Sequence, residues 1–261
     1  KNFVSYKQHI ASHSAQKEFA YVTYVSSSEF VPAAATLMYS IAQTGSRHAR
    51  AVLVTKDVLQ RDREALSLLA QLIEIDVIPA PKYVSNKRYR ETFTKLRIWE
   101  LAMFTKVVYV DTDVIIVRNM DDLFDLDEWS VPMDAEQNRY STGMMIVQPS
   151  LETFDSMMKH LKTTEVSMEL PDLLFLKDYF EKVAPKKINI IPRWYQVYQE
   201  EFGSQYSTYL TSRKEKITIY DSRIHGIHYP GENKPWREFN DRMAKYSTQF
   251  CHWDEAEEFK Y

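Results

Sequence analysis

Two aspartates one residue apart, Asp111 and Asp113, follow directly after the apolar run from Val107 to Val110. The run is continuously apolar, which is typical of a strand buried on both faces of a parallel sheet. Ligands of open α/β sheets gather beyond the carboxyl ends of such strands. Carboxylate oxygens suit Mg²⁺ or Mn²⁺, and substrate phosphates often complete the metal's shell. The pattern predicts a metal site for a phosphorylated substrate. The alternative is a turn that only caps the next element.

A second group of residues lies in the segment His228-x-x-Gly231-x-x-Lys234-Pro-Trp236. A neutral imidazole is a common metal ligand, so His228 could complete a site begun by the two aspartates. Gly231 would let the backbone approach a phosphate, and Lys234 would place a positive charge against it. The alternatives are that His228 is a packing or surface residue and that Lys234 is a solvated lysine beside a Pro-Trp turn.

Composition limits the classes of protein that fit. A chain of 261 residues with 44% hydrophobic content predicts one domain, or one domain with a C-terminal elaboration. A net charge of −3 predicts no broad surface for nucleic acid or an anionic membrane. The single cysteine, Cys251, and the lack of a signal-peptide pattern or a bilayer-spanning apolar stretch favour a cytoplasmic protein. The sequence does not begin with Met, so an N-terminal anchor stays open.

Strand-like and helix-like patterns alternate through the first half, which favours an α/β fold with a mainly parallel sheet. The strands expected there are 19–25, 51–55, 72–78 and 107–110, and the helices are 31–43, 61–70 and 94–104. Serine hydroxyls at 26–28 are expected to cap the first helix, and Gly45 to end it. In the second half the expected strands are 130–133, 144–148, 187–191, 217–220 and 223–228, and the helices are 150–161 and 172–182.

These residues resemble the glycogenin-like glycosyltransferases, family 8 of the sequence-based classification, from about Phe19 to Trp236. The motifs that carry the resemblance are Ala20-Tyr-Val-Thr23, Thr94-Lys95-Leu96, Tyr109-Val-Asp111-Thr-Asp113, Asp121-Asp-Leu-Phe124, Gly143 with Gln148-Pro149-Ser150, and His228 to Trp236. The resemblance implies a nucleotide-sugar-binding α/β fold of the GT-A type in a single domain. A nucleotide-binding half is then expected at about 19–120, an acceptor- and sugar-binding half at about 121–236, and a C-terminal tail at 237–261. The resemblance also implies transfer of a hexose, galactose or glucose, from a UDP-sugar with retention of anomeric configuration.

By the same resemblance, Asp111, Asp113 and His228 hold Mn²⁺ or Mg²⁺. The residues implied for the donor are Tyr24 and Ser26 at the uridine, Phe30 on uracil, Lys95 and Thr112 at the donor, Asp134 at sugar hydroxyls, and Gly231 and Lys234 at the diphosphate. Asp172 lies near the reacting centre, and Lys234 offsets charge on the departing UDP. The alternatives are an N-cap role for Asp172 and a core role for Phe30.

Two departures from the family pattern concern the catalytic arrangement. Ser141-Thr142-Gly143 stands where the family often has Asn-Ser before the glycine, and Asp172-Leu173 stands where it has Asp-Gln. They leave the metal residues intact but leave the sugar choice open.

An external acceptor is expected, because nothing marks Tyr206 or Tyr209 as a self-acceptor. These features resemble a cytoplasmic protist branch of the family, galactosyltransferases that extend the glycan on the adaptor subunit of an SCF ubiquitin ligase. The partners implied are therefore a UDP-sugar and a glycan or glycoprotein such as that adaptor, with a homodimer as a further option.

Two other classes of protein remain as alternatives. A haloacid-dehalogenase-type phosphatase would use Asp111 as nucleophile and Asp113 as acid/base. That class carries its motif on the first strand of the core, whereas here some three strand-helix units precede it. A non-catalytic sugar-nucleotide or glycan-binding module is the second alternative.

Overall fold

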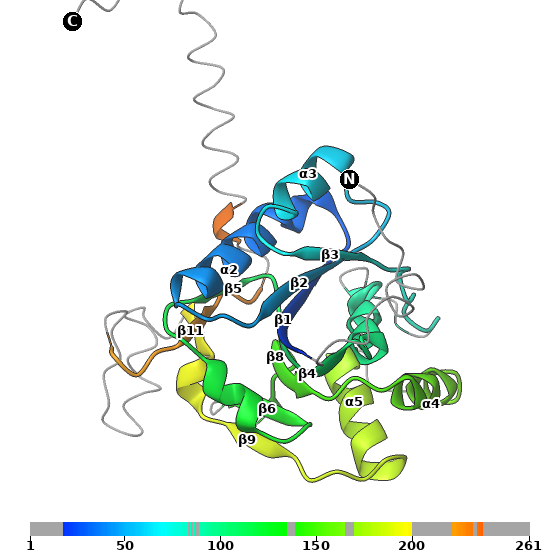
Figure 1. Ribbon diagram of the computed structural model, residues 1–261. Helices are drawn as coiled ribbons and strands as arrows, with labels where there is room; N and C mark the ends of the chain where they lie inside the picture. The colour runs from blue at the N-terminus through cyan, green and yellow to red at the C-terminus, as the bar shows by residue number, and fades with distance from the viewer. Residues whose placement is uncertain are drawn as a thin grey trace, which may run out of the picture.

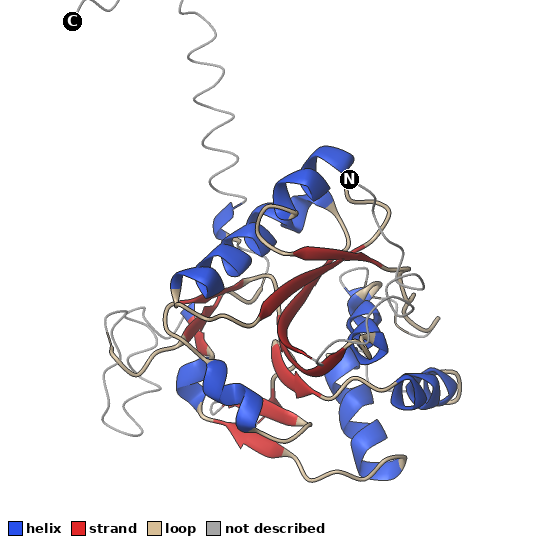
Figure 2. Cartoon of the chain, in the orientation of Figure 1, coloured by secondary structure: helices blue, strands red, loops and turns tan. Residues whose placement is uncertain are grey.

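The computed structural model describes residues 18–82, 84, 86, 89–134, 139–164, 170–199, 221–231 and 234–236, without the side chains of 134 and 139. These residues form a layered α/β domain in which a twisted central sheet has helices on both faces (Figures 1 and 2). The α/β class predicted from the alternating patterns is confirmed.

The first half of the described chain alternates strands and helices, as predicted. Its elements are β1 (Glu18–Val25), α2 (Val31–Gln43), β2 (Ala49–Val54), α3 (Gln60–Leu66), β3 (Gln71–Glu74), the 3-10 segment η3 (Thr92–Glu100) and β4 (Phe104–Val110). Pro32 lies in the first turn of α2, where its missing N–H is not needed, and Gly45 follows the helix with a φ of +79°. The strand that precedes the aspartates is therefore the fourth along the chain.

The second half has shorter elements. They are β5 (Val114–Ile116), η4 (Asp121–Asp125), β6 (Ser130–Asp134), β7 (Arg139–Tyr140), β8 (Met144–Val147), α4 (Leu151–Leu161), α5 (Pro171–Lys182), β9 (Asn189–Ile191), η5 (Arg193–Tyr195), β10 (Val197–Tyr198) and β11 (Gly226–His228). Helix α4 begins as expected, because the Ser150 hydroxyl accepts a hydrogen bond from the Thr153 amide. The expected strand 217–220 lies outside the described residues.

The order of the main sheet is β3-β2-β1-β4-β8-β6-β7, with β9 paired to β6. Strands β3, β2, β1 and β4 are parallel, whereas β8 runs antiparallel to β4. A small second sheet has the order β10-β11-β5, and β11 runs antiparallel to β5. This second sheet begins just after the two aspartates, so it brings a late segment of the chain to the end of β4.

The main sheet is buried on both faces by two separate apolar clusters. Alternate residues of the strands face opposite ways, so Val107 and Tyr109 belong to one cluster and Val108 and Val110 to the other. The first cluster also contains residues of η3, α4 and α5, and the second contains residues of α2. Burial on both faces explains why these strands read as continuous apolar runs.

Several expected boundaries were wrong. Helix α3 ends at Leu66 rather than at residue 70. Residues 67–70 form turns in which Leu68 is 85% exposed, while Leu69 and Ala70 still pack against the cluster that contains α2. Strand β3 ends at Glu74, whose carboxylate pairs with Arg63 at 2.6 Å. Residues 92–100 form a 3-10 helix in place of the expected helix 94–104.

The expected serine caps at 26–28 are also not formed. The N-cap residue of α2 is Phe30, without a side-chain hydrogen bond. Instead, the Ser28 hydroxyl accepts the backbone N–H of Leu59, so it tethers the loop after β2.

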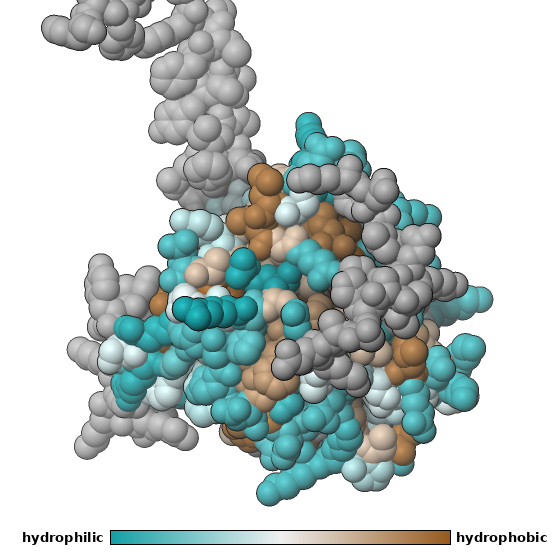
Figure 3. Space-filling model, in the orientation of Figure 1, coloured by the Kyte–Doolittle hydropathy of each residue, from teal (hydrophilic) through white to brown (hydrophobic). Residues whose placement is uncertain are grey.

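Hydrophilic side chains cover most of the described surface on the face drawn in Figure 3, with smaller hydrophobic patches between them. Among the described residues, no helix has both the length and the apolar character that crossing a membrane requires.

Candidate functional site

The two aspartates lie in a tight turn between β4 and β5. The amide of Val114 donates to the Asp111 carbonyl at 3.2 Å, which closes this turn. Strand β11 pairs with β5 so that His228 lies opposite Val114, and the Tyr229 amide donates to the Asp113 carbonyl at 2.8 Å. Backbone pairing therefore brings His228 beside residues more than a hundred positions earlier in the chain.

The side chains of Asp111, Asp113 and His228 converge. One ligand atom from each lies within 4.8 Å of the others. The His228 Nε2 atom is 3.1 Å from Asp113 Oδ1, and the His228 side chain is 9% exposed. Two carboxylates and one imidazole are a donor set that suits Mn²⁺, and the carboxylates also suit Mg²⁺. The residues present therefore fit a divalent metal ion.

Asp113 is the most strongly charge-paired member of this group. Its Oδ2 atom accepts from Lys234 Nζ at 2.5 Å, and Lys234 also donates to the Tyr229 carbonyl at 2.8 Å. Burial alone would raise the pKa of Asp113, but His228 and Lys234 outweigh it and hold the pKa well below its ordinary value. Asp113 is thus an anion at neutral pH, as a metal ligand must be.

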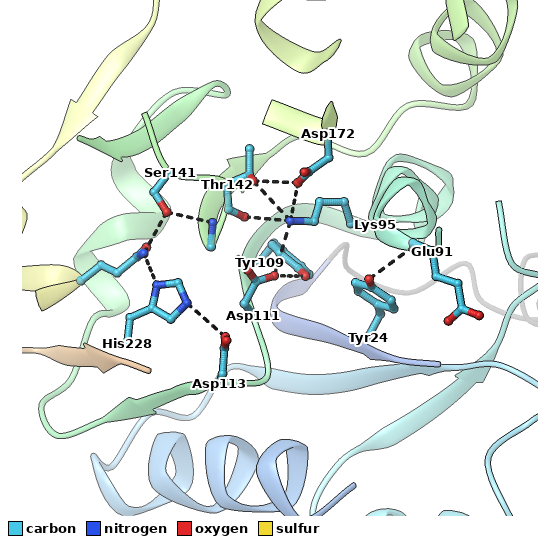
Figure 4. A network of polar contacts seen from close by, with 12 residues as sticks. Tyr24, Glu91, Lys95, Tyr109, Asp111, Asp113, Ser141, Thr142, Asp172 and His228 are labelled. Atoms are coloured by element: carbon cyan, nitrogen blue, oxygen red, sulfur yellow. Dashed lines mark hydrogen bonds and ion pairs between the residues drawn. The ribbon is translucent and has the colours of Figure 1, made fainter. Parts of the chain in front are cut away.

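A second charged group lies next to the first (Figure 4). Lys95 is 4% exposed, and its Nζ atom is 2.8 Å from Asp172 Oδ2 and 3.5 Å from Asp111 Oδ1. The Thr142 hydroxyl donates to the same Asp172 oxygen at 2.9 Å. Burial alone would lower the pKa of Lys95, but Asp111 and Asp172 raise it above its ordinary value. Lys95 therefore links the carboxylate of Asp111, at the candidate metal site, to the more deeply buried carboxylate of Asp172.

Two tyrosines complete this buried group. The Tyr109 hydroxyl donates a short hydrogen bond to Asp111 Oδ1, and burial and then Asp111 raise the pKa of Tyr109. The Tyr24 hydroxyl donates to the Glu91 carbonyl at 3.4 Å, and burial raises the pKa of Tyr24 as well. Both hydroxyls therefore stay protonated, and the one on Tyr109 fixes an oxygen of Asp111.

Close packing around the metal-facing side chains depends on Gly143. The Asp111 amide donates to the Gly143 carbonyl at 2.8 Å, so the two backbones are adjacent. A Cβ atom at this position would lie 2.9 Å from His228 Cε1, 3.0 Å from Gln196 Nε2 and 3.3 Å from Asp111 Oδ2. Only glycine leaves room for these three side chains in their present positions.

Asp172 belongs to the buried charge network and does not cap a helix. Helix α5 begins at Pro171, so Asp172 lies inside the first turn, and the N-cap residue is Leu170. The Asp172 side chain is 7% exposed, and its carboxylate points to Lys95 and Thr142. The N-cap alternative was therefore wrong.

The other predicted donor-site residues line the same end of the sheet or lie nearby. Phe30 packs partly against the apolar cluster that contains α2, and its ring makes an edge contact with Trp236 at 6.1 Å between centroids. Ser26 and Thr112 are half-buried, in the loops that follow β1 and β4. Gly231 has a φ of +81°, a conformation that favours glycine.

A few predicted residues lie partly or wholly outside the described part of the structure. Asp134 ends β6, but its side chain lies outside the described part of the structure. Tyr206, Tyr209, Cys251 and the tail 237–261 also lie outside it.

Sequence reasoning missed Gln196 and the bonding role of Thr142. The Gln196 Nε2 atom is 2.6 Å from His228 Nδ1 and 2.9 Å from Ser141 Oγ. Nothing in the sequence around Gln196 marks it, because the two-residue strand β10 that follows is too short to be recognised. Lys95 was predicted to reach the donor, and its pairing with Asp172 was not foreseen.

Comparison with known proteins identifies the family. The family model described as glycosyl transferase family 8 matches residues 21–131, which include both aspartates. Glycogenin-1 of Oryctolagus cuniculus is 27% identical over 233 residues, which cover 87% of this chain and 68% of the glycogenin. The chain belongs to glycosyltransferase family 8.

Two relatives from Arabidopsis thaliana are longer than this chain. Inositol phosphorylceramide glucuronosyltransferase 1 of Arabidopsis thaliana is 30% identical and covers 85% of the chain, but the chain covers only 43% of it. Putative UDP-glucuronate:xylan alpha-glucuronosyltransferase 5 of the same plant is 32% identical. The match covers 97% of this chain and 41% of that relative. The chain thus spans less than half the length of these two relatives.

Solved structures of glycosyltransferases share the fold. Galactosyltransferase LgtC, solved in complex with donor and acceptor sugar analogs, has a TM-score of 0.61 and 13% identity over 92% of this chain and 97% of that one. The apo form of GlyE of Streptococcus pneumoniae has a TM-score of 0.62 and 17% identity, with 89% of this chain and 60% of that one covered. At these identities the likeness shows the GT-A fold alone, which confirms the fold prediction.

Proposed function

We propose that this family 8 chain transfers a hexose from a UDP-sugar to a glycan or glycoprotein, with a divalent metal ion held by Asp111, Asp113 and His228. The observation that carries the proposal is the convergence of these three side chains at the carboxyl end of β4. That is the edge of the sheet at which ligands bind in α/β folds. The family assignment makes a nucleotide-sugar the expected ligand there.

We assign separate roles in donor binding and leaving-group stabilisation to the metal site, Lys234, Gly231 and Phe30. A bound Mn²⁺ would act as a Lewis acid toward the diphosphate leaving group. Lys234, already 2.5 Å from Asp113, would turn its ammonium group to the β-phosphate, where negative charge grows as the glycosidic bond breaks. Gly231 would let the backbone approach the diphosphate, and Phe30 would stack on the uracil ring.

Asp172 is our candidate for the carboxylate nearest the reacting carbon. Lys95 and Thr142 hold one of its oxygens, Oδ2, and fix the side chain in a single orientation. Retention would follow from attack by this carboxylate or from attack of the acceptor on the same face of the sugar as the leaving group. We assign Lys95 the task of orienting Asp111 and Asp172 together, and Tyr109 the task of fixing Asp111.

Our proposals for the acceptor, the cellular location and the oligomeric state rest on the sequence alone. We propose an external glycan or glycoprotein, such as the adaptor subunit of an SCF ubiquitin ligase, a cytoplasmic location and a homodimer as the option for assembly. A direct test of the acceptor is transfer of radiolabelled sugar to defined oligosaccharides, because self-transfer would label the chain itself.

Glucuronate is a second candidate for the donor sugar. The names of two relatives specify glucuronosyl transfer, and one of these names specifies UDP-glucuronate as the donor. Glycogenin-1 is less similar, at 27% identity. A donor panel should therefore contain UDP-glucuronate beside UDP-glucose and UDP-galactose.

The experiment that tests the proposal is slow hydrolysis of each UDP-sugar, with Mn²⁺ and with a chelator. We expect UDP release from one donor in Mn²⁺ and none after chelation or in Asp113→Asn. Asp125→Asn is a matched control, because Asp125 is exposed and follows Phe124, whose carbonyl binds Lys106 near the other end of β4. Metal-dependent UDP binding without any hydrolysis or transfer would favour the non-catalytic binding module.

Release of phosphate from a phosphomonoester, with no UDP release from any UDP-sugar, would instead favour the phosphatase alternative.

A further inference from the structure

Gln196 is the buried polar side chain nearest to the imidazole of His228. It is 4% exposed and precedes β10, which pairs with the strand of His228. The Gln196 amide donates to the Arg193 carbonyl at 3.1 Å, so the turn of η5 fixes its backbone. Tyr198, two residues later, lies opposite His228 in the pairing and packs on its ring at 5.4 Å. The position of Gln196 is therefore set by the backbone, not by chance contact of a surface side chain.

The two nitrogens of His228 face different partners. Nε2 lies 3.1 Å from Asp113, on the side of the candidate metal site, and Nδ1 lies 2.6 Å from Gln196 Nε2. With the carboxamide nitrogen donating to Nδ1, the ring hydrogen is on Nε2, where it donates to Asp113. A metal ion bound at Nε2 needs the lone pair there, so the ring hydrogen has to move to Nδ1. That hydrogen then needs a buried acceptor.

The carboxamide of Gln196 has an acceptor to offer. Its Oε1 atom is buried and has no hydrogen-bond partner among the described residues. Rotation of the carboxamide by about half a turn exchanges oxygen and nitrogen and places Oε1 beside Nδ1. The Ser141 hydroxyl, which accepts from the Gly143 amide at 3.2 Å, can then donate its hydrogen to the same oxygen.

We propose that Gln196 is a positioning residue for metal binding, whose side-chain oxygen accepts the Nδ1 hydrogen of His228 when Nε2 binds the metal ion. The inference rests on the proposed function, because it concerns the same metal site. Outer partners of this kind fix the tautomer and plane of a metal-binding histidine, and their loss typically weakens metal affinity by about 10- to 100-fold. Ser141 would hold the carboxamide in its metal-binding orientation.

The test is direct titration of Mn²⁺ in the presence of UDP, followed by calorimetry and by the electron paramagnetic resonance signal of free Mn²⁺. Gln196→Met keeps the length of the side chain and removes both polar atoms. We expect it to weaken Mn²⁺ binding by about 10- to 100-fold. Gln196→Glu supplies an acceptor only, and we expect Mn²⁺ affinity equal to or tighter than that of the wild type.

A matched control is Gln43→Met, at the exposed end of α2, which should leave Mn²⁺ affinity unchanged. Thermal unfolding of each variant checks the fold. If Gln196→Met does not fold, Gln196→Glu decides alone, because weaker Mn²⁺ binding by an acceptor-only side chain would overturn the proposal.

Three results would contradict the role of Gln196, and they point to different causes. Unchanged Mn²⁺ affinity in folded Gln196→Met would overturn this inference and leave the proposed function intact. Equal loss in the Met and Glu variants would mean that the carboxamide acts through its N–H group or its packing. Failure of the wild type to bind Mn²⁺ would overturn both proposals.

Discussion

Replacing Lys95 with methionine should destabilise the fold more than removal of an ordinary lysine, because two carboxylates depend on its charge. Lys95 and Asp172 are 4% and 5% exposed, and their charged atoms are 2.8 Å apart, with Asp111 at 3.5 Å. Breaking a buried pair from one side typically costs about 3 to 5 kcal/mol, because the remaining charge is buried without compensation. We expect a loss of that size in the free energy of unfolding, measured with urea at pH 8.

The pH dependence of this loss comes from the carboxylates that the variant leaves without a counter-charge, because Lys95 itself stays charged in the wild type. The pKa of Lys95 is raised in the folded state, so the stabilisation is fully present below the ordinary value of 10.5 and is lost only as pH rises through the raised value. The wild type keeps it throughout pH 5 to 8. In Lys95→Met, proton uptake by one of the two carboxylates relieves the unpaired charge. The loss should therefore be smaller at pH 5 than at pH 8.

Two further variants separate the charge effect from simple packing. Lys106→Met is the matched control, because Lys106 donates to the carbonyls of Phe124 and Leu126 at 2.7 Å and pairs with no carboxylate in the described residues. Its loss should be about 1 to 3 kcal/mol and independent of pH in this range. Adding Asp172→Asn to Lys95→Met should recover part of the stability. Equal, pH-independent losses in Lys95→Met and Lys106→Met would refute the reasoning.

Three further predictions concern ligand binding and turnover. Gly143→Ala should weaken Mn²⁺ binding, because its Cβ would lie 2.9 Å from the ring of His228; unchanged affinity by calorimetry would show that the ring moves freely. Phe30→Ala should weaken UDP binding by about 1 to 3 kcal/mol with the fold retained, whereas a lower melting temperature with unchanged UDP affinity would identify a core residue. Lys234→Ala should lower kcat by about 10²-fold with little change in KM, and an unchanged kcat in steady-state assays would mark a solvated lysine.

The main sheet was predictable because its strands are buried on both faces. Runs such as Val107 to Val110 are then continuously apolar, and the aspartates at their carboxyl end stand out in the sequence. The end of α3 at Leu66 was missed because the apolar spacing continues through Leu69 and Ala70, which pack against the core from turns and not from a helix. The 3-10 geometry of residues 92–100 likewise depends on tertiary packing, which local periodicity does not contain.

The candidate metal site was predictable in its residues and not in its surroundings. Asp111, Asp113 and His228 could be named because their types and motifs are distinctive, and the structure brings them together. Gln196 could not, because it reaches His228 through the pairing of two very short strands. The partner of Lys95 was also missed, since Asp172 and Lys95 are joined only by the packing of α5 beside η3.

The central claim is that Asp111, Asp113 and His228 bind a divalent metal ion that in turn binds UDP. The most direct measurement is calorimetric titration of UDP into the wild type and Asp113→Asn, each with Mn²⁺ and with a chelator, with Asp125→Asn as control. We predict that the wild type and Asp125→Asn bind UDP tightly in Mn²⁺ and weakly in chelator. We predict that Asp113→Asn binds UDP no more tightly in Mn²⁺ than in chelator. Equal UDP affinity with and without Mn²⁺ in the wild type, or full Mn²⁺ dependence in Asp113→Asn, would contradict it.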